Sequence, residues 1–175
     1  SGVQNVTESA MKLGEAIYKA TQEAEGDAEP EMKGAEHAIT SNEIFHLERL
    51  PKNMLILGGG YIACEFAGIM NGLGVDVTQY YRGAQILRGF DDEARGLVSE
   101  EMIENGVKLH LGTNILEMQK VDGGIRVIST NGHDEVFEQV MFATGRAPNT
   151  QDMGLEAVGV TGIGDLVLCP GHRDL

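Results

Sequence analysis

Residues 54–63 read Met-Leu-Ile-Leu-Gly-Gly-Gly-Tyr-Ile-Ala. Four consecutive apolar residues closed by glycines are typical of a central parallel strand that is buried on both faces. A helix should follow the glycines, because Ile62, Phe66, Ile69 and Met70 recur at helical spacing. The stretch therefore predicts a strand, a tight glycine turn and an amphipathic helix, in that order.

The glycine triplet fits the fingerprint Gly-x-Gly-x-x-Gly/Ala of dinucleotide-binding folds, in the strand–turn–helix context that this motif requires. Gly58 permits the tight turn, Gly60 lets the backbone approach a pyrophosphate, and Ala63 keeps the helix close to the sheet. The unpaired N–H groups of the helix would face the phosphates. The alternative, a merely flexible glycine loop, is disfavoured by the strand and the helix on either side.

The end of the second expected strand, residues 75–81, bears on cofactor choice. Folds that prefer NAD usually carry Asp or Glu there, to bind the ribose 2′-hydroxyl. Here Tyr81 and Arg82 occupy the place, and Arg82 and Arg88 lie on the following loop, where guanidinium groups can bind a 2′-phosphate. We therefore expect NADPH rather than NADH. The two arginines alone do not exclude the alternative, that both are ordinary solvated surface charges.

The rest of the chain continues the alternation of strands and helices. Ser41 is expected to cap a short helix that runs through Leu47, and Asp91 to begin a second long helix. The remaining strands are expected at 107–111, 114–121, 125–130 and 140–143. The predicted fold class is α/β: a Rossmann-like central parallel sheet flanked by helices, with an inserted antiparallel β-meander.

Three segments are expected along the chain. Residues 1–35 combine a helix, indicated by apolar spacing near residues 4–23, with an acidic linker that buries little. Residues 36–160 form the NAD(P)H-binding domain, and residues 161–175 form a tail of unknown structure.

Composition excludes several classes of function. With 175 residues and a formal charge of −14, the chain lacks the basic surface that nucleic acids and anionic membranes require. No signal pattern or apolar run of membrane-spanning length occurs, so a cytoplasmic protein is expected.

Reactive side chains are few and scattered. Cys64 and Cys169 form no Cys-x-x-Cys pair, and the five histidines lack metal-ligand spacing, so neither a redox disulfide nor a metal site is expected. Cys64 is interpreted as a packed thiol on the first long helix. No Gly-x-Ser-x-Gly nucleophile elbow is present, and no catalytic residue is assigned.

The stretch from Leu57 to Gly68 resembles the NADPH-domain signature of glutathione reductases, in the pyridine nucleotide-disulfide oxidoreductase family. Other segments resemble that family in the same order, and the similarity covers roughly residues 34 to 160. These segments are residues 38–41, 45–51, 81–91 and 142–149.

The resemblance implies roles near the nicotinamide. Tyr61 is similar to the aromatic lid that covers the nicotinamide pocket and swings aside for NADPH, although a Tyr packed at the helix start remains an alternative. Glu65 is similar to a carboxylate that pairs with a lysine of the FAD domain. Gly145 would line the far side of the cleft.

The resemblance also implies roles along the adenosine and phosphates. Gly59 and Ile62 would contact the phosphates and ribose through backbone, and Arg82 and Arg88 match the family's ligands for the 2′-phosphate. One departure is Gly83, which stands where many relatives place another basic or histidine side chain.

A complete reductase of this family has a preceding FAD domain, a Cys-x4-Cys redox disulfide and an interface domain with a catalytic histidine, which the sequence lacks. We expect an NADPH-binding domain isolated from those parts and inactive alone. The expected partner is an FAD-binding segment or a second copy of this chain, and no FAD site is identified in the chain itself. The alternatives are a non-catalytic nucleotide-binding or interaction module, and a truncated or fused product. Residues 10–20 weakly resemble the end of the helical lid of DnaK-type chaperones.

Overall fold

The computed structural model describes residues 33–146, 153–154, 157, 161–163 and 166–168. The helix expected at 4–23, most of the acidic linker and the chaperone-like stretch lie outside these residues, so they stay predictions.

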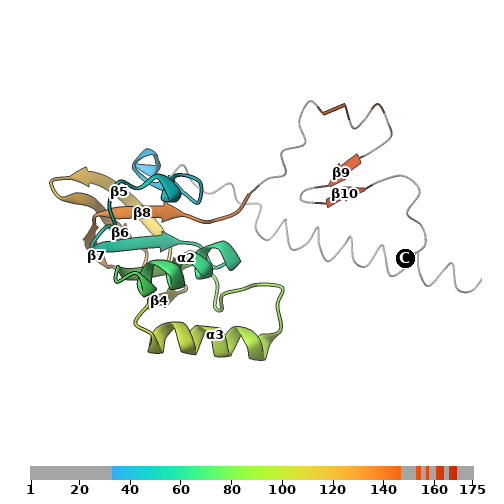
Figure 1. Ribbon diagram of the computed structural model, residues 1–175, viewed down its shortest axis with the longest axis horizontal. Helices are drawn as coiled ribbons and strands as arrows, with labels where there is room; N and C mark the ends of the chain where they lie inside the picture. Colours follow the sequence, from blue (N-terminus) through green and yellow to red (C-terminus); the bar gives the residue numbers. More distant parts are fainter. Residues whose placement is uncertain (1–32, 147–152, 155–156, 158–160, 164–165, 169–175) are drawn as a thin grey trace, which may run out of the picture.

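A five-stranded parallel sheet forms the centre of the described domain (Figure 1). Its strands are β1 (Ile39–Thr40), β2 (Asn53–Leu57), β3 (Asp76–Tyr81), β4 (Lys108–Leu111) and β8 (Gln139–Phe142), in the spatial order β1-β8-β2-β3-β4. From β2 the chain adds β3 and β4 on one side, and then returns to place β8 on the other side of β2. In open α/β sheets, ligands bind at the carboxyl ends of the strands where the order reverses in this way.

Two α-helices follow β2 and β3, as the sequence predicts. Helix α2 (Tyr61–Gly72) begins directly after the glycine triplet, and α3 (Asp92–Glu104) begins after Asp91. One carboxylate oxygen of Asp91 accepts hydrogen bonds from the N–H groups of Glu93 and Ala94, both at 3.1 Å. The predicted start of the second long helix is therefore confirmed, with Asp91 as its N-cap.

The prediction that Ser41 caps a helix through Leu47 is wrong. The segment forms a 3₁₀-helix, η2 (Glu43–His46), whose N-cap is Asn42 and makes no side-chain capping bond. The Glu43 carboxylate instead accepts a hydrogen bond from the Thr40 N–H at 2.8 Å, and a second from the Thr40 hydroxyl. This local pair satisfies the turn without Ser41. A second 3₁₀-helix, η1 (Ala35–His37), precedes β1.

The inserted meander is also confirmed. Strands β5 (Ile115–Val121), β6 (Gly124–Ser129) and β7 (Asp134–Phe137) form a separate antiparallel sheet in the order β5-β6-β7. A further antiparallel pair, β9 (Thr161–Ile163) and β10 (Leu166–Leu168), was not predicted.

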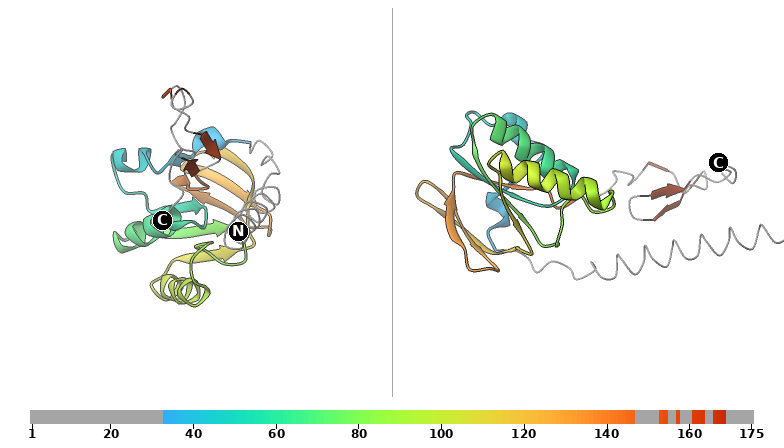
Figure 2. Two further views of the ribbon diagram at one scale, coloured as in Figure 1. Left: turned by 90° about the vertical axis from the view of Figure 1, so that its right-hand side faces the viewer. Right: turned by 90° about the horizontal axis from the view of Figure 1, so that it is seen from below.

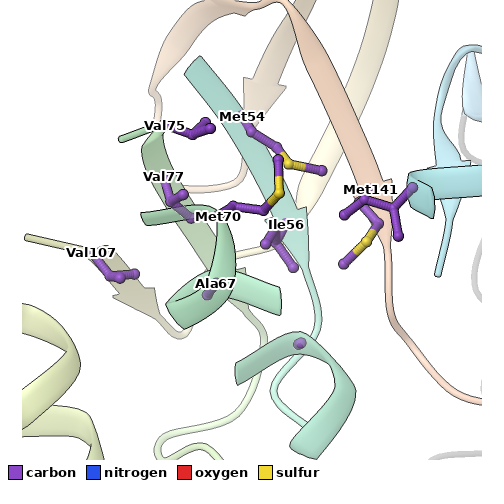
Figure 3. Packing of buried hydrophobic residues seen from close by; sticks show 10 residues of the cluster. Met54, Ile56, Ala67, Met70, Val75, Val77, Val107 and Met141 are labelled. Atoms are coloured by element: carbon purple, nitrogen blue, oxygen red, sulfur yellow. The ribbon is translucent and has the colours of Figure 1, made fainter. Parts of the chain in front are cut away.

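The helices and the meander cover opposite faces of the parallel sheet, as the views in Figure 2 show. Because side chains alternate along a strand, Met54 and Ile56 of β2 pack in the cluster that includes α2, shown in Figure 3. Leu55 and Leu57 pack against the meander instead. Burial on both faces is the physical reason why residues 54–57 of β2 are continuously apolar.

Candidate functional site

The glycine turn lies at the junction between β2 and α2, next to the reversal in strand order. Gly58 has a φ angle of 142°, and a Cβ there would lie 2.3 Å from the carbonyl oxygen of Ala143. The Gly58 N–H donates to the Tyr80 carbonyl at 2.9 Å, and the Ala143 N–H donates to the Leu57 carbonyl at 2.8 Å. The turn is thus held between β3 and the chain that leaves β8, and only glycine fits at position 58.

The amino end of α2 is open to a ligand. Gly60, the N-cap, has an extended backbone, is exposed, and has no heavy atom within 4 Å of a Cβ built on it. The Cys64 N–H donates to the Gly60 carbonyl at 3.1 Å, and the amides before it in the helix have no intrahelical acceptor. Ala63 is fully buried, as expected for close packing of the helix on the sheet. These features suit the binding of a diphosphate.

A buried glutamine of β3, which the sequence analysis did not single out, is hydrogen-bonded to the glycine turn. The side-chain amide of Gln79 is fully buried and donates to the Gly58 carbonyl at 2.9 Å and to the Cys64 sulfur at 3.7 Å. Burial raises the pKa of the Cys64 thiol, which agrees with its interpretation as a packed, unreactive side chain. Gln79 lies in β3 between Thr78 and Tyr80, and its two acceptors belong to the glycine turn and to α2, so no local pattern marks its role.

The loop between β3 and α3 carries both predicted arginines, and each is exposed. The loop folds back on the glycine turn, because the Leu87 N–H donates to the Gly59 carbonyl at 2.6 Å and Ile86 is fully buried. Leu87 itself has a φ of 55°, a left-handed conformation that is uncommon for a side chain of this size. The structure thus attaches the segment with Arg82 and Arg88 directly to the fingerprint.

Arg95 of α3, a second residue that the sequence analysis missed, braces the same loop. Its guanidinium group donates to the Ile86 carbonyl at 2.7 Å, to the Gln85 carbonyl at 3.1 Å and to the Asp92 carboxylate at 2.6 Å. The only sequence signal was its position one turn after the helix start. Its acceptors are loop carbonyls, which sequence patterns do not reveal.

Several of the predicted cofactor-binding residues lie on or beside one groove. Ile62 and Glu65 of α2 line it, together with Arg146, whose guanidinium group donates to Asn42 at 3.1 Å. Gly145, which precedes Arg146, is exposed and has a φ of 149°. Tyr61 stands at the first position of α2 with 57% of its surface exposed, so its ring is not packed in the core.

Large apolar side chains line the rest of this groove, between η2 and α2. Phe45 is 76% exposed and makes an edge-to-face contact with Phe66, and Leu50, Ile69 and Leu73 are also exposed. Apolar patches of this kind mark surfaces that contact another protein segment or a ligand.

The described residues contain neither a metal-binding cluster nor a membrane-spanning helix. In this part of the chain, no three histidine, cysteine or acidic residues gather closely enough to hold a metal ion. None of the described helices is long and apolar enough to cross a membrane.

Comparisons with known proteins agree with this geometry. Residues 19–166 match the family model described as pyridine nucleotide-disulphide oxidoreductase. The chain is 47% identical over 131 residues to a glutathione reductase from Burkholderia cepacia, covering 75% of this chain and 29% of that protein. It is 42% identical over 149 residues to a glutathione reductase from Nostoc sp., covering 83% and 32%. The HOCl-induced flavoprotein disulfide reductase RclA from Escherichia coli shares the fold, with a TM-score of 0.66, 24% identity, and coverage of 75% and 31%. The chain thus spans about a third of the length of the relatives that it matches.

Proposed function

Because the chain belongs to the pyridine nucleotide-disulphide oxidoreductase family, we propose that residues 36–160 are the NADPH-binding domain of a glutathione-reductase-like enzyme. The observation that carries the proposal is the junction of β2 and α2. There an open helix terminus, and a loop with two arginines that is hydrogen-bonded to Gly59, lie at the carboxyl edge of the sheet. Residues 1–35 and 161–175 are then accessory segments, and a cytoplasmic location stays a prediction.

Each part of NADPH, from the adenosine 2′-phosphate to the nicotinamide, has residues in this chain that would bind it. The amides of the glycine turn and of the first turn of α2 would bind the pyrophosphate, with Gly60 leaving room for the close approach. Arg82 and Arg88 would bind the 2′-phosphate through charge-assisted hydrogen bonds. Gly59 and Ile62 would contact the phosphates and ribose through backbone. Glu65 would lie beside the nicotinamide, Gly145 would line the far side of the cleft, and Tyr61 would be the movable cover.

We also propose that another polypeptide segment holds the FAD, and the apolar groove supports this. Glu65 lies in the groove among exposed apolar side chains, as expected of a surface that a second domain covers. With both cofactors bound, the nicotinamide would supply the hydride that reduces the flavin. This chain would bind and orient the nicotinamide for that step, and alone it would not turn over.

Calorimetric titration of the chain with NADPH and NADH tests the proposal. The unaltered chain should bind NADPH more tightly than NADH. In the double variant Arg82→Ala/Arg88→Ala, NADPH affinity should fall about tenfold to a hundredfold, because charge-assisted bonds to the 2′-phosphate are lost. NADH affinity should change little, since NADH has no 2′-phosphate.

Arg126→Ala is the matched control. Arg126 pairs with Asp134 in the meander at 2.5 Å, so this variant removes a surface guanidinium group that lies outside the proposed site. Equal NADPH and NADH affinities in the unaltered chain would refute the 2′-phosphate site. Failure to bind either nucleotide would leave the non-catalytic interaction module as the better hypothesis. A yellow purified protein would contradict the claim that FAD is held elsewhere.

A further inference from the structure

The ring of Tyr81, at the end of β3, lies between Gly59 of the glycine turn and Gly83 of the loop that carries the arginines. A Cβ built on Gly59 would lie 2.4 to 2.6 Å from three carbon atoms of the Tyr81 ring. A Cβ built on Gly83 would lie 2.5 Å from Cε1 of the same ring and 3.0 Å from its hydroxyl oxygen. The ring therefore fills the space that side chains at both positions would need.

Neither glycine is required by backbone conformation, since Gly59 and Gly83 are absent from the positive-φ glycines of the described residues. Glycine is required at both positions only because a side chain there would overlap the Tyr81 ring. A side chain at position 83 would overlap the ring where it now stands.

The backbone on both sides of the ring is fixed. The Tyr81 carbonyl accepts a hydrogen bond from the Thr113 N–H at 3.0 Å, and the Gly83 carbonyl accepts one from the Gly112 N–H at 3.1 Å. Leu87 joins the far part of the loop to Gly59 at 2.6 Å. The ring lies between the glycine turn and the loop with the arginines, where it fills the space beside Gly59 and Gly83.

We propose that Tyr81 is the positioning residue that sets this site for NADPH, an inference that rests on the proposed function. The half-buried ring occupies the strand end where an acidic side chain would bind the ribose 2′-hydroxyl of NADH. It also acts as a spacer that holds the arginine loop at the distance from the pyrophosphate turn that the adenosine 2′-phosphate requires. Tyr81 thus favours NADPH by its volume and neutrality, and Arg82 and Arg88 by their charge.

Four single variants and one double variant of the chain, each titrated with NADPH and NADH, test the inference. Tyr81→Phe keeps the ring and should preserve the ratio of the two affinities. Tyr81→Ala should lower the preference for NADPH about tenfold, because the loop loses its spacer. Tyr81→Asp should lower it further, and should raise NADH affinity, because a carboxylate then faces the ribose hydroxyls. Gly83→Ala should lower NADPH affinity in the native background, but have little effect when combined with Tyr81→Ala.

The outcomes separate this inference from the proposed function. If the unaltered chain prefers NADPH and Tyr81→Ala leaves the affinity ratio within about twofold, the role of Tyr81 is refuted and the proposed function stands. If the unaltered chain binds no nucleotide, the proposed function fails and the inference fails with it. If Tyr81→Ala does not fold, Gly83→Ala and Tyr81→Asp decide, since a purely structural ring would give no change in the NADPH-to-NADH ratio.

Discussion

At the scale of single residues, the fingerprint glycines serve different physical needs. Gly58 combines a φ of 142° with a Cβ position that overlaps the Ala143 carbonyl, whereas Gly60 has an ordinary φ of −80° and open space. Gly58→Ala should therefore lower the free energy of unfolding by at least about 2 kcal/mol, from backbone strain and overlap. Urea denaturation measures this change.

Gly60→Ala is the matched partner of that variant. It should cost no more than about 1 kcal/mol of stability, as a change from Gly to Ala at an N-cap. NADPH affinity should nevertheless fall about tenfold, because the methyl group would project toward the pyrophosphate. A Gly60→Ala protein that binds NADPH normally would contradict the placement of the diphosphate on this turn.

At the scale of elements, the arginine loop depends on its attachment to α3. The Arg95 side chain is only 16% exposed and its guanidinium group binds two loop carbonyls. Arg95→Lys keeps the charge but loses the planar fork, so unfolding free energy should fall by about 1–2 kcal/mol and NADPH affinity should fall as well. Arg126→Lys, at a more exposed pair, should change stability by less than about 1 kcal/mol. Equal losses of stability in Arg95→Lys and Arg126→Lys would contradict the proposal that Arg95 holds the loop in place.

The contact between β4 and the meander should make stability depend on pH. His110 of β4 lies edge-to-face with Tyr80 and with His133, at centroid distances of 5.3 and 4.9 Å. Burial, and next the neighbouring His133, lower the pKa of His110 from its ordinary 6.5, with Lys108 adding to this and Glu135 opposing it. The fold therefore prefers neutral His110. Its contribution is present above pH 6.5 and is lost as the pH falls through the lowered pKa.

Thermal unfolding of the chain and of His110→Phe between pH 7.5 and 5.5 measures this contribution, over about two units around the ordinary histidine pKa. His110→Phe keeps an aromatic ring and removes the titrating group, so its Tm should fall less across this range than that of the unaltered chain. The acidic net charge affects both proteins alike, so it cancels when the two slopes of Tm against pH are compared. Parallel slopes would exclude His110 as the source.

At the scale of the whole molecule, the groove between η2 and α2 is a part of the described surface where exposed apolar side chains gather. Ile69 and Leu73 are 54% and 58% exposed within it, and Leu97 of α3 is 59% exposed outside it. Ile69→Gln/Leu73→Gln should reduce the fluorescence of bound ANS by about half, because the dye binds contiguous apolar surface. Leu97→Gln should have little effect. A similar loss in both variants would show that the groove is not a distinct surface.

The sequence by itself did not predict β1 or the β9–β10 pair. It did determine the glycine turn, the two long helices, the strands of the central sheet from β2 onward, the meander, and the place of Arg82 and Arg88 on the loop after β3. Each of these follows from local properties: alternation or helical spacing of apolar residues, the conformational freedom of glycine, and the cap at Asp91. The Ser41 cap failed because the competing bond between Thr40 and Glu43 is equally local and gives no stronger signal.

Only the tertiary structure decided how these parts act together. The overlap of Gly58 with Ala143, the ring of Tyr81 between two glycines, and the Gln79 bond to the turn all join residues that are far apart in the chain or on different elements. The groove likewise arises where η2 and α2 meet. Such contacts depend on the packing of the sheet, the helices and the meander, and packing is a property of the folded chain that no single stretch of sequence contains.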